Sequence, residues 1–268
     1  MIQTQALAKK IRISALKMVH RAKASHIGSA LSIADILAVL YGEVMHFNSA
    51  DQHLDSRDRF ILSKGHACVA VYATLAEMDF ISKDALETYG DDFSWLMNHI
   101  SHKVNGVEFS TGSLGHGLSF GVGKSLSAKI RGEKWRTFVV MSDGEMDEGS
   151  NWEALMFAAH NKLSNLTAII DYNKLQSLNS VAHTLGLEPF VDKLIAFGCS
   201  VHEIDGHDHQ LLLEALTSIA DDKPTVIVAH TIKGKGVSFM ENIVEWHYKN
   251  PNDEQLAIAL SELEVAHA

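Results

Sequence analysis

Two short apolar runs, separated by a helical stretch, constrain the fold of this chain most strongly. The first run covers residues 138–141 and leads into Asp143, and the second covers 166–170 and leads toward Asn173. The stretch between them, about 150–163, has the pattern of a helix. A strand, a helix and a second strand in this order form the unit from which parallel sheets are built. The pattern therefore predicts a parallel sheet.

The rest of the chain continues this alternation. Ser150 and Glu153 have the spacing of a capping box and predict the start of the central helix, and Asp208 is expected to cap a later one. Gly117 and Gly121, one turn apart, predict a helix packed closely against another backbone. We expect an α/β fold with a mostly parallel sheet and helices on both faces. The expected helices cover about 4–23, 32–45, a segment from 67, 115–130, 150–163, 188–197, a segment after 208 and the C-terminus; the expected strands cover 60–62, 138–141, 166–171, 199–204 and 225–229, with a loop at 91–113.

Length and composition indicate one domain of residues 1–268. The chain has only three prolines, and no linker-like or low-complexity segment separates its halves. A domain of this size can bury roughly 75% of the surface of its unfolded chain, which is enough for a large core.

The sequence also limits the cellular setting and the partners. The N-terminus lacks the charged start and apolar stretch of a signal peptide, and no run of about 18 apolar residues predicts a membrane span. Two cysteines are too few for a disulfide framework, so we expect a cytoplasmic protein. With a formal net charge of −10 and no basic stripe, we expect neither a nucleic acid nor a membrane as partner.

Asp143 and Asn173 predict a metal–diphosphate site. Each follows a predicted strand, and the carboxyl ends of parallel strands share one edge of the sheet, where such folds bind their ligands. Carboxylate and amide oxygens, completed by diphosphate oxygens, suit Mg²⁺. In a chain of net charge −10 the cation is also needed, because unit charges 4 Å apart interact by about 4 kcal/mol at an effective dielectric of 20. Taken singly, Asp143 reads as an ordinary acid at a strand end and Asn173 as a turn residue; the pairing favours metal binding.

Other acidic and histidine clusters carry weaker signals. Glu145, Asp147 and Glu148 lie in one loop. Most such clusters of acidic residues are solvent-exposed or lie in the first turn of a helix, where the helix dipole favours them. His207 and His209 resemble a metal cluster, but Asp208 between them reads better as a helix cap. Four histidines lie in loop-like or glycine-bearing settings, where functional groups concentrate, and these are His26, His66, His99 and His247.

Two glycine-rich nucleotide-binding motifs are nearly matched, but each lacks one required glycine. Gly123-Lys124-Ser125 would end a phosphate loop of the Walker type, but the required earlier glycine is Leu118. Gly115-His116-Gly117 would begin a dinucleotide fingerprint, but its third glycine position holds Phe120. Both readings are rejected.

Five motifs in order resemble the thiamine-diphosphate-binding half of transketolases, and the similarity spans nearly the whole chain. They are Ala24-Ser25-His26-Ile27-Gly28, Leu62-Ser63-Lys64-Gly65-His66, the segment Ser110 to Gly117, Asp143-Gly144 through Asn173, and Lys233-Gly234-Lys235-Gly236 through Trp246-His247. The chain looks like the N-terminal subunit of a split transketolase.

The resemblance implies the cofactors and the site residues. Thiamine diphosphate would bind with Mg²⁺, or with Ca²⁺ or Mn²⁺ in its place. The implied metal ligands are Asp143, Asn173 and the backbone carbonyl of Leu175. The implied cofactor contacts are Gly115, Ser113, Leu114, Gly144, Glu145, Asn173 and His66. The implied catalytic residues are His26, His66, His247 and His99, which would move protons above the cofactor, and Glu148, which would link the two active sites of a dimer.

The motifs depart from the family pattern at several positions. Ser25-His26-Ile27-Gly28 replaces Gly-His-Pro-Gly, Gly115-His116-Gly117 replaces Gly-Gln-Gly, and Trp246-His247-Tyr248 replaces Trp-His-Gly. His99 and His102 compete for one channel-histidine position. The donor and acceptor sugars stay open.

The family's second, pyrimidine-binding domain carries the glutamate that activates the cofactor, and we expect it on a separate C-terminal subunit in an α2β2 assembly. The resemblance then implies transfer of a two-carbon ketol unit between a ketose and an aldose, with sugar phosphates expected in both roles and activity only in the presence of that partner. The alternatives are a subunit of another thiamine-diphosphate enzyme (a deoxyxylulose-phosphate-type synthase or a 2-oxo acid decarboxylating component), a non-catalytic assembly or regulatory homologue, and a plain nucleotide-binding module.

Overall fold

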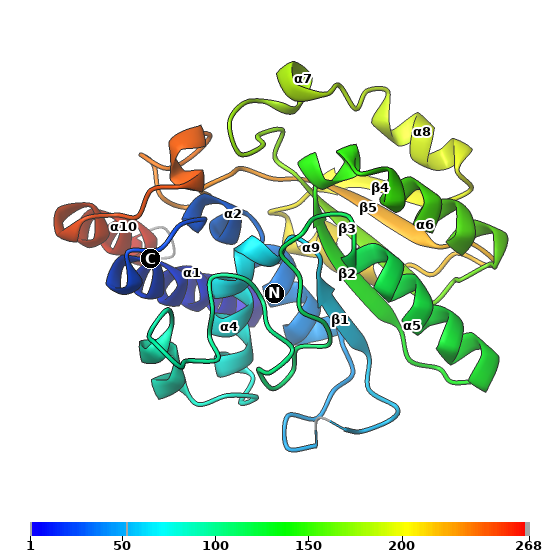
Figure 1. Cartoon of the computed structure of the whole chain (residues 1–268), viewed down its shortest axis with the longest axis horizontal. Helices are drawn as coiled ribbons and strands as arrows, with labels where there is room; N and C mark the ends of the chain where they lie inside the picture. The colour runs from blue at the N-terminus through cyan, green and yellow to red at the C-terminus, as the bar shows by residue number, and fades with distance from the viewer. Residues whose placement is uncertain (1, 52, 266–268) are drawn as a thin grey trace.

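A parallel β-sheet forms the centre of the molecule, with helices on both faces (Figure 1). The structure is a computed structural model that describes residues 2–51 and 53–265. Within these residues the sheet has five strands in the order β1-β2-β3-β5-β4, and every neighbouring pair is parallel. The strands are β1 (Arg59–Leu62), β2 (Thr137–Ser142), β3 (Leu166–Tyr172), β4 (Ser200–Asp205) and β5 (Thr225–His230).

Alternating side chains of the central strands enter two hydrophobic cores. Phe138 and Val140 of β2 belong to the core on one face, whereas Val139 and Met141 belong to the core on the other. All seven residues of β3 are buried. Strands covered on both faces need apolar residues at nearly every position, which is why these segments appear as continuous apolar runs rather than alternating ones.

One face of the sheet is covered by α5 (Gly117–Arg131), α6 (Gly149–His160) and α8 (Phe190–Ala196). On this side Gly117 and Gly121 permit the close approach predicted from the sequence. A Cβ on Gly117 would lie 2.8 Å from the Cα of Ser63, and one on Gly121 would lie 2.5 Å from the Cγ2 of Val139. Both glycines therefore allow α5 to lie directly on the sheet.

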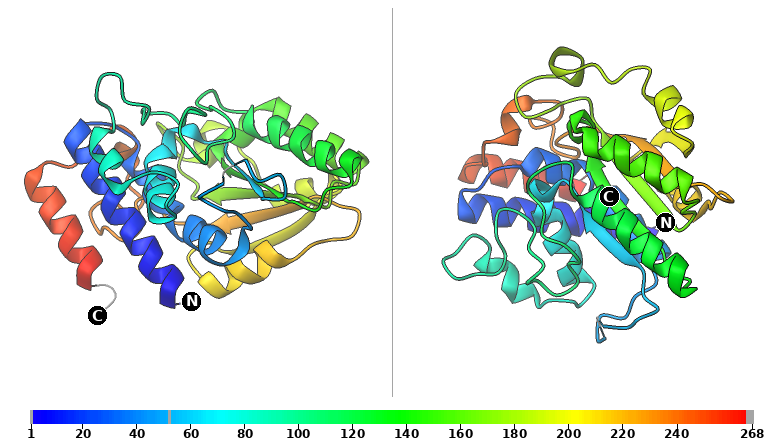
Figure 2. Two further views of the ribbon diagram at one scale, coloured as in Figure 1. Left: turned by 90° about the horizontal axis from the view of Figure 1, so that it is seen from below. Right: turned by 45° about the vertical axis from the view of Figure 1, so that its right-hand side comes forward.

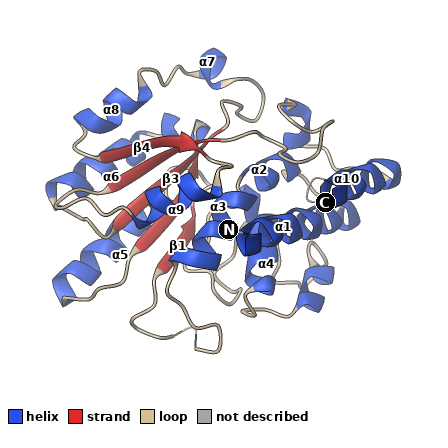
Figure 3. Ribbon diagram, turned by 180° about the vertical axis from the view of Figure 1, so that it is seen from behind, coloured by secondary structure: helices blue, strands red, loops and turns tan. Residues whose placement is uncertain are grey.

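Helices from both halves of the chain cover the other face (Figure 2). They include α1 (Ile2–Ala22), α2 (Ile27–Ser32), α3 (Ala34–Val39), α4 (Cys68–Glu77) and α9 (His209–Thr217). The C-terminal helix α10 (Asp253–Val265) packs beside α1 at one end of the molecule, so the first and last helices are neighbours (Figure 3). Short helical turns complete the structure: η1 (Leu40–Val44), η2 (Gly65–Ala67), η3 (Lys83–Thr88), η4 (Gly144–Asp147), α7 (Val181–Thr184) and η5 (Val244–His247).

The predicted fold class is confirmed, a strand forms at or next to each of the five expected segments, and one local prediction is wrong. The capping box at Ser150 does not form: α6 begins at Gly149, and the Ser150 hydroxyl donates to the carbonyl of Gly115 instead (2.7 Å). The helix expected at 32–45 is observed as α3 followed by the π-helical turn η1, and a further short helix, α2, precedes it and ends at Ser32. Asp208 does cap α9, accepting from the backbone N–H groups of Gln210 and Leu211.

None of the described helices combines the length and the apolarity that crossing a bilayer would need.

Candidate functional site

The carboxyl ends of β1, β2, β3 and β5 meet at one edge of the sheet, and a pocket opens there. Ser142, Asp143 and Gly144 reach it from β2, and Asn173 and Leu175 reach it from β3. The parallel order of the strands therefore brings together the two segments that the sequence analysis paired, although 30 residues separate Asp143 from Asn173.

Asp143 is the buried carboxylate of the pocket, only 1% exposed. Its Oδ1 accepts from the backbone N–H of Gly144 (2.7 Å), and its Oδ2 accepts from that of Lys174 (2.6 Å). Burial and the nearby Asp171 raise the pKa of Asp143 to about 6. A bound cation would remove this penalty, because it compensates the negative charge where water cannot.

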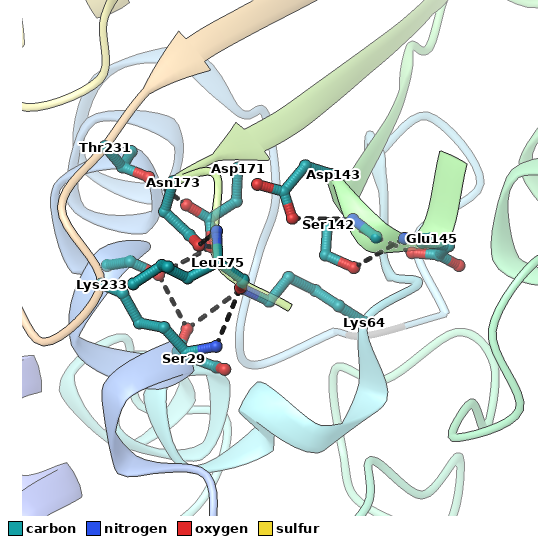
Figure 4. Close-up of polar contacts among 12 residues, drawn as sticks. Ser29, Lys64, Ser142, Asp143, Glu145, Asp171, Asn173, Leu175, Thr231 and Lys233 are labelled. Carbon is teal, nitrogen blue, oxygen red and sulfur yellow. Dashed lines mark hydrogen bonds and ion pairs between the residues drawn. The ribbon is translucent and has the colours of Figure 1, made fainter. Parts of the chain in front are cut away.

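Asn173 and Leu175 add two neutral oxygens beside Asp143 (Figure 4). The amide of Asn173 has a fixed orientation: its Oδ1 accepts from the N–H of Leu175 (3.0 Å), and its Nδ2 donates to Asp171 (3.1 Å). The described residues contain no cluster of three or more His, Cys, Asp or Glu side chains arranged for a metal. One carboxylate, one amide oxygen and one carbonyl instead form the set of hard donors with which Mg²⁺ binds when a diphosphate supplies the rest. The residues present fit that ion.

Two buried lysines flank these oxygens, and the sequence alone assigns neither of them a role. Lys233 is 1% exposed and donates to the carbonyls of Leu175 and Gln176 (3.0 Å each). Burial and the second cation, Lys64, lower the pKa of Lys233 to about 8. Lys64, also 1% exposed, forms an ion pair with Asp171 and donates to the carbonyl of Ser29 (3.2 Å). Both lie in motifs quoted for the family, but only the fold shows that they are buried against the pocket.

Four histidines from separate segments line the mouth of the pocket. The ring of His26 lies 5.1 Å from that of His247, 5.3 Å from that of His66 and 5.6 Å from that of His99, between centroids. His102 instead lies on the surface and hydrogen-bonds to Ser110. Of the two competitors for the channel position, the structure thus brings only His99 into the cluster.

The environment keeps these imidazoles neutral at neutral pH. Burial, helped by His99 and Lys233, lowers the pKa of His26 to about 4, and burial with Lys233 lowers that of His247 to about 3. Burial also lowers the pKa of His66 and of His99. A neutral imidazole has one donor and one acceptor, so such a ring can give a proton to a hydroxyl group or take one from it. In His247 the acceptor is already used, because its Nδ1 lies 3.1 Å from the Lys233 ammonium, which leaves Nε2–H as a donor.

The depressed pKa values predict a loss of stability in mild acid. The unfolded chain takes up protons as the pH falls below about 6.5, the ordinary pKa of histidine, whereas folded His26 and His247 stay neutral until about 4 and 3. The free energy of unfolding should therefore fall between pH 7 and 5. Thermal unfolding of the cofactor-free chain, measured across this pH range, checks the prediction.

His26→Gln should make the stability depend less steeply on pH, whereas the control His53→Gln, at an exposed position, should not. The same pH dependence in both variants would contradict the assignment of the effect to the buried histidine.

The loop before α5 supplies a backbone that lies close to α6. Gly115 has a φ of +84°, and a Cβ there would lie 2.8 Å from the Cβ of Glu148, so only glycine fits without strain. Its N–H donates to the buried Glu145 (2.9 Å). Glu145 therefore fixes the loop through this hydrogen bond and does not line the pocket. Leu114 and Gly144 do line it. Ser113 and Glu148 are exposed, outside the pocket lining.

Comparison with known proteins identifies the family of the chain. The family model of the transketolase thiamine diphosphate binding domain matches residues 3–263. The chain belongs to this family.

Transketolase relatives match over most of this chain. A subunit of apulose-4-phosphate transketolase from Phocaeicola vulgatus is 41% identical, over 96% of this chain and 92% of its own length. A 6-deoxy-6-sulfo-D-fructose transketolase subunit from a Clostridium species is 36% identical, over 98% and 97%. Among solved structures, transketolase from Leishmania mexicana superposes with a TM-score of 0.91 at 31% identity, covering 97% of this chain and 41% of that longer enzyme. The resemblance drawn from the five motifs is confirmed, and with it the assignment as a thiamine-diphosphate-binding, transketolase-type transferase subunit.

Proposed function

We propose that this transketolase subunit binds thiamine diphosphate together with Mg²⁺ and works with a second chain to transfer a two-carbon ketol unit between sugar phosphates. The observation that carries the proposal is the meeting of three oxygen donors and a buried ammonium group in a pocket whose mouth is lined by four neutral histidines.

The tail of the cofactor would lie at the strand ends. Asp143, Asn173 and the carbonyl of Leu175 would hold the metal ion, and Ca²⁺ or Mn²⁺ could replace Mg²⁺ there. The ammonium of Lys233 now donates to two backbone carbonyls, and it is the buried cation placed to pair with a diphosphate oxygen. Gly144 lines the pocket without a side chain and lets the backbone approach the diphosphate.

The mouth of the pocket would handle the sugars. Thiamine diphosphate, when bound, supplies the electron sink for making and breaking carbon–carbon bonds next to a carbonyl. His26, His66 and His99 would orient the sugar hydroxyls and hold or accept their protons, because they are neutral and the rings of His66 and His99 both lie beside that of His26. His247 would donate from Nε2, because its Nδ1 faces Lys233. Glu148, exposed at the start of α6, would face a second copy of the chain, and Glu145, Leu114, Ser113 and Gly115 would shape the loop beside the cofactor.

A separate subunit would complete the site. The relatives from Phocaeicola vulgatus and Clostridium are named as subunits, and we propose a C-terminal transketolase subunit, carrying the activating glutamate, in an α2β2 assembly. The sugars named for these relatives are apulose 4-phosphate and a sulfonated fructose. Both are sugars with an anionic group, a phosphate in one and a sulfonate in the other, which supports an anionic sugar such as a sugar phosphate as substrate here.

The subunit hypothesis predicts that turnover depends on the partner. Purified alone, the chain should bind Mg²⁺–thiamine diphosphate but show no transfer of ketol units above background. Adding the protein that co-purifies with it from its native source should restore turnover with sugar-phosphate pairs in a coupled assay. Full activity of the chain alone would refute the two-subunit proposal. Cofactor binding without activity even with the partner would instead support a non-catalytic homologue.

A further inference from the structure

A second group of buried charges lies behind the pocket, between the N-terminal helices and the turn after β4. Asp35 of α3 is 6% exposed, and Arg12 of α1 donates to both of its carboxylate oxygens (3.1 and 2.5 Å). His207 and His209 bind the same carboxylate from the turn and from α9, at 2.7 and 3.1 Å. Arg12, with the hydrogen bonds of both histidines, holds the pKa of Asp35 well below its usual range, although burial alone would raise it.

The hydrogen bonds of His207 fix its tautomer. The backbone N–H of Ile232 donates to Nε2 of His207 (2.8 Å), so Nε2 carries no proton. The proton must lie on Nδ1, where it is donated to Oδ2 of Asp35. His207 is therefore a bridge, accepting on one side from the chain and donating on the other to a fixed carboxylate.

The hydrogen bond of His207 to the chain is made at Ile232, one residue before Lys233. Strand β5 ends at His230, and the segment that follows carries Lys233 into the pocket. Beyond Lys233, the N–H of Gly234 donates to the carbonyl of Gly28 (3.0 Å). The Ile232 bond to His207 thus fixes the backbone immediately before the lysine, and the Gly234 bond fixes it immediately after.

The need to compensate the charge of Asp35 does not by itself explain why His207 binds this carboxylate. Arg12 already satisfies both oxygens of Asp35 with two bonds, the arrangement in which a guanidinium pairs best with a carboxylate. His209 binds Asp35 as well, yet its other nitrogen contacts the hydroxyl of Thr4 (2.8 Å), away from the pocket. Of these two histidines, His207 is the one that joins Asp35 to the segment leading into Lys233.

We propose that His207, held in one tautomer by Asp35, is a positioning residue that sets the place of Lys233 for the diphosphate end of the cofactor. The inference rests on the proposed binding of Mg²⁺–thiamine diphosphate in this pocket. It does not involve contact between His207 and the cofactor; the effect is transmitted through the backbone of residues 232 and 233. Supporting residues of this kind keep a binding group within the small tolerance that its geometry demands.

Two variants of His207 separate positioning from folding. In His207→Asn the short amide can still donate to Asp35 but cannot reach the N–H of Ile232. In His207→Gln the longer amide can again accept from that N–H. The matched control is His209→Asn, because it perturbs the same carboxylate at a similarly buried position and leaves the Ile232 contact intact.

Two measurements test the proposal. Calorimetric titration with thiamine diphosphate at saturating Mg²⁺ should show about tenfold weaker binding for His207→Asn, which corresponds to about 1.4 kcal/mol. His207→Gln should recover most of the affinity, and His209→Asn should keep it. In the cofactor-free chain, amide hydrogen exchange at residues 232 and 233 should be faster in His207→Asn only, while the interior of β5 stays protected.

The outcomes distinguish the inference from the function on which it rests. Wild-type affinity in His207→Asn, or equal losses in His207→Asn and His209→Asn, would overturn the positioning role while leaving cofactor binding intact. Absence of binding by the wild-type chain would overturn the proposed function itself, and the inference with it.

Discussion

Replacing Asp171 with alanine is expected to lower the free energy of unfolding by about 3–5 kcal/mol, the range for breaking a buried ion pair. Asp171 is fully buried at the end of β3, and its partner Lys64 is 1% exposed. The carboxylate also accepts from Ser32 (2.7 Å), Thr231 and Asn173. Its removal would leave the Lys64 ammonium without its counter-charge, and burial would then penalise the charged form. Urea unfolding of the cofactor-free chain measures the change.

The ion pair itself can be tested with a double variant. Asp171→Leu combined with Lys64→Met removes both charges together, so it should regain part of the stability lost in Asp171→Ala. Recovery should be incomplete, because Ser32, Thr231 and Asn173 also lose their shared acceptor. Ser32→Ala, which removes a single donor to the same carboxylate, should cost only about 1 kcal/mol. A loss in Asp171→Ala no larger than that in Ser32→Ala would show that the ion pair contributes little.

Replacing Asp143 with alanine is expected to abolish the stabilisation of the chain by Mg²⁺ and thiamine diphosphate. A ligand at 100 times its Kd stabilises the folded state by about 2.7 kcal/mol, and this whole increment should disappear. The physical reason is that Asp143 supplies the only carboxylate among the three proposed metal ligands. Melting temperatures with and without metal and cofactor measure the effect.

Two controls accompany the Asp143 variant. Glu153→Ala removes a carboxylate ten residues along the chain, outside the pocket lining, and should keep the full cofactor-induced shift. Chelation of the metal should reduce the wild-type shift to that of Asp143→Ala. An unchanged shift in Asp143→Ala would show that the metal is held elsewhere.

The sheet and the meeting of Asp143 and Asn173 at its edge could be predicted because both depend on local pattern. The apolar runs before Asp143 and Asn173 identify strands, and parallel connection places their ends at one edge. A local pattern failed where a residue distant in the sequence offered a hydrogen-bonding partner. Ser150 has the spacing of a helix cap, but its hydroxyl bonds to Gly115, which no pattern within the helix could reveal.

Other features depend on contacts across the whole chain. Nothing in the local sequence around Lys64 and Lys233 indicates that the fold buries both side chains against the pocket. The segment around His207 was read from its local residues, and Asp208 does cap α9 as expected, but the carboxylate that binds His207 lies 172 residues earlier. Such pairings follow from the packing of α3 against the turn after β4, and short-range periodicity carries no information about them.

The contrast between the strand ends and the mouth of the pocket has a consequence for which substitutions the site can accept. The proposed metal ligands lie at or just beyond the ends of buried strands, where most substitutions would disturb the core. Around the mouth, by contrast, Tyr248 is exposed beside His26 and His247, and it differs from the family motif. Exposed positions of this kind tolerate substitution. A change at an exposed position beside the histidines would therefore leave the buried strand ends, and the oxygens proposed to hold the metal, undisturbed.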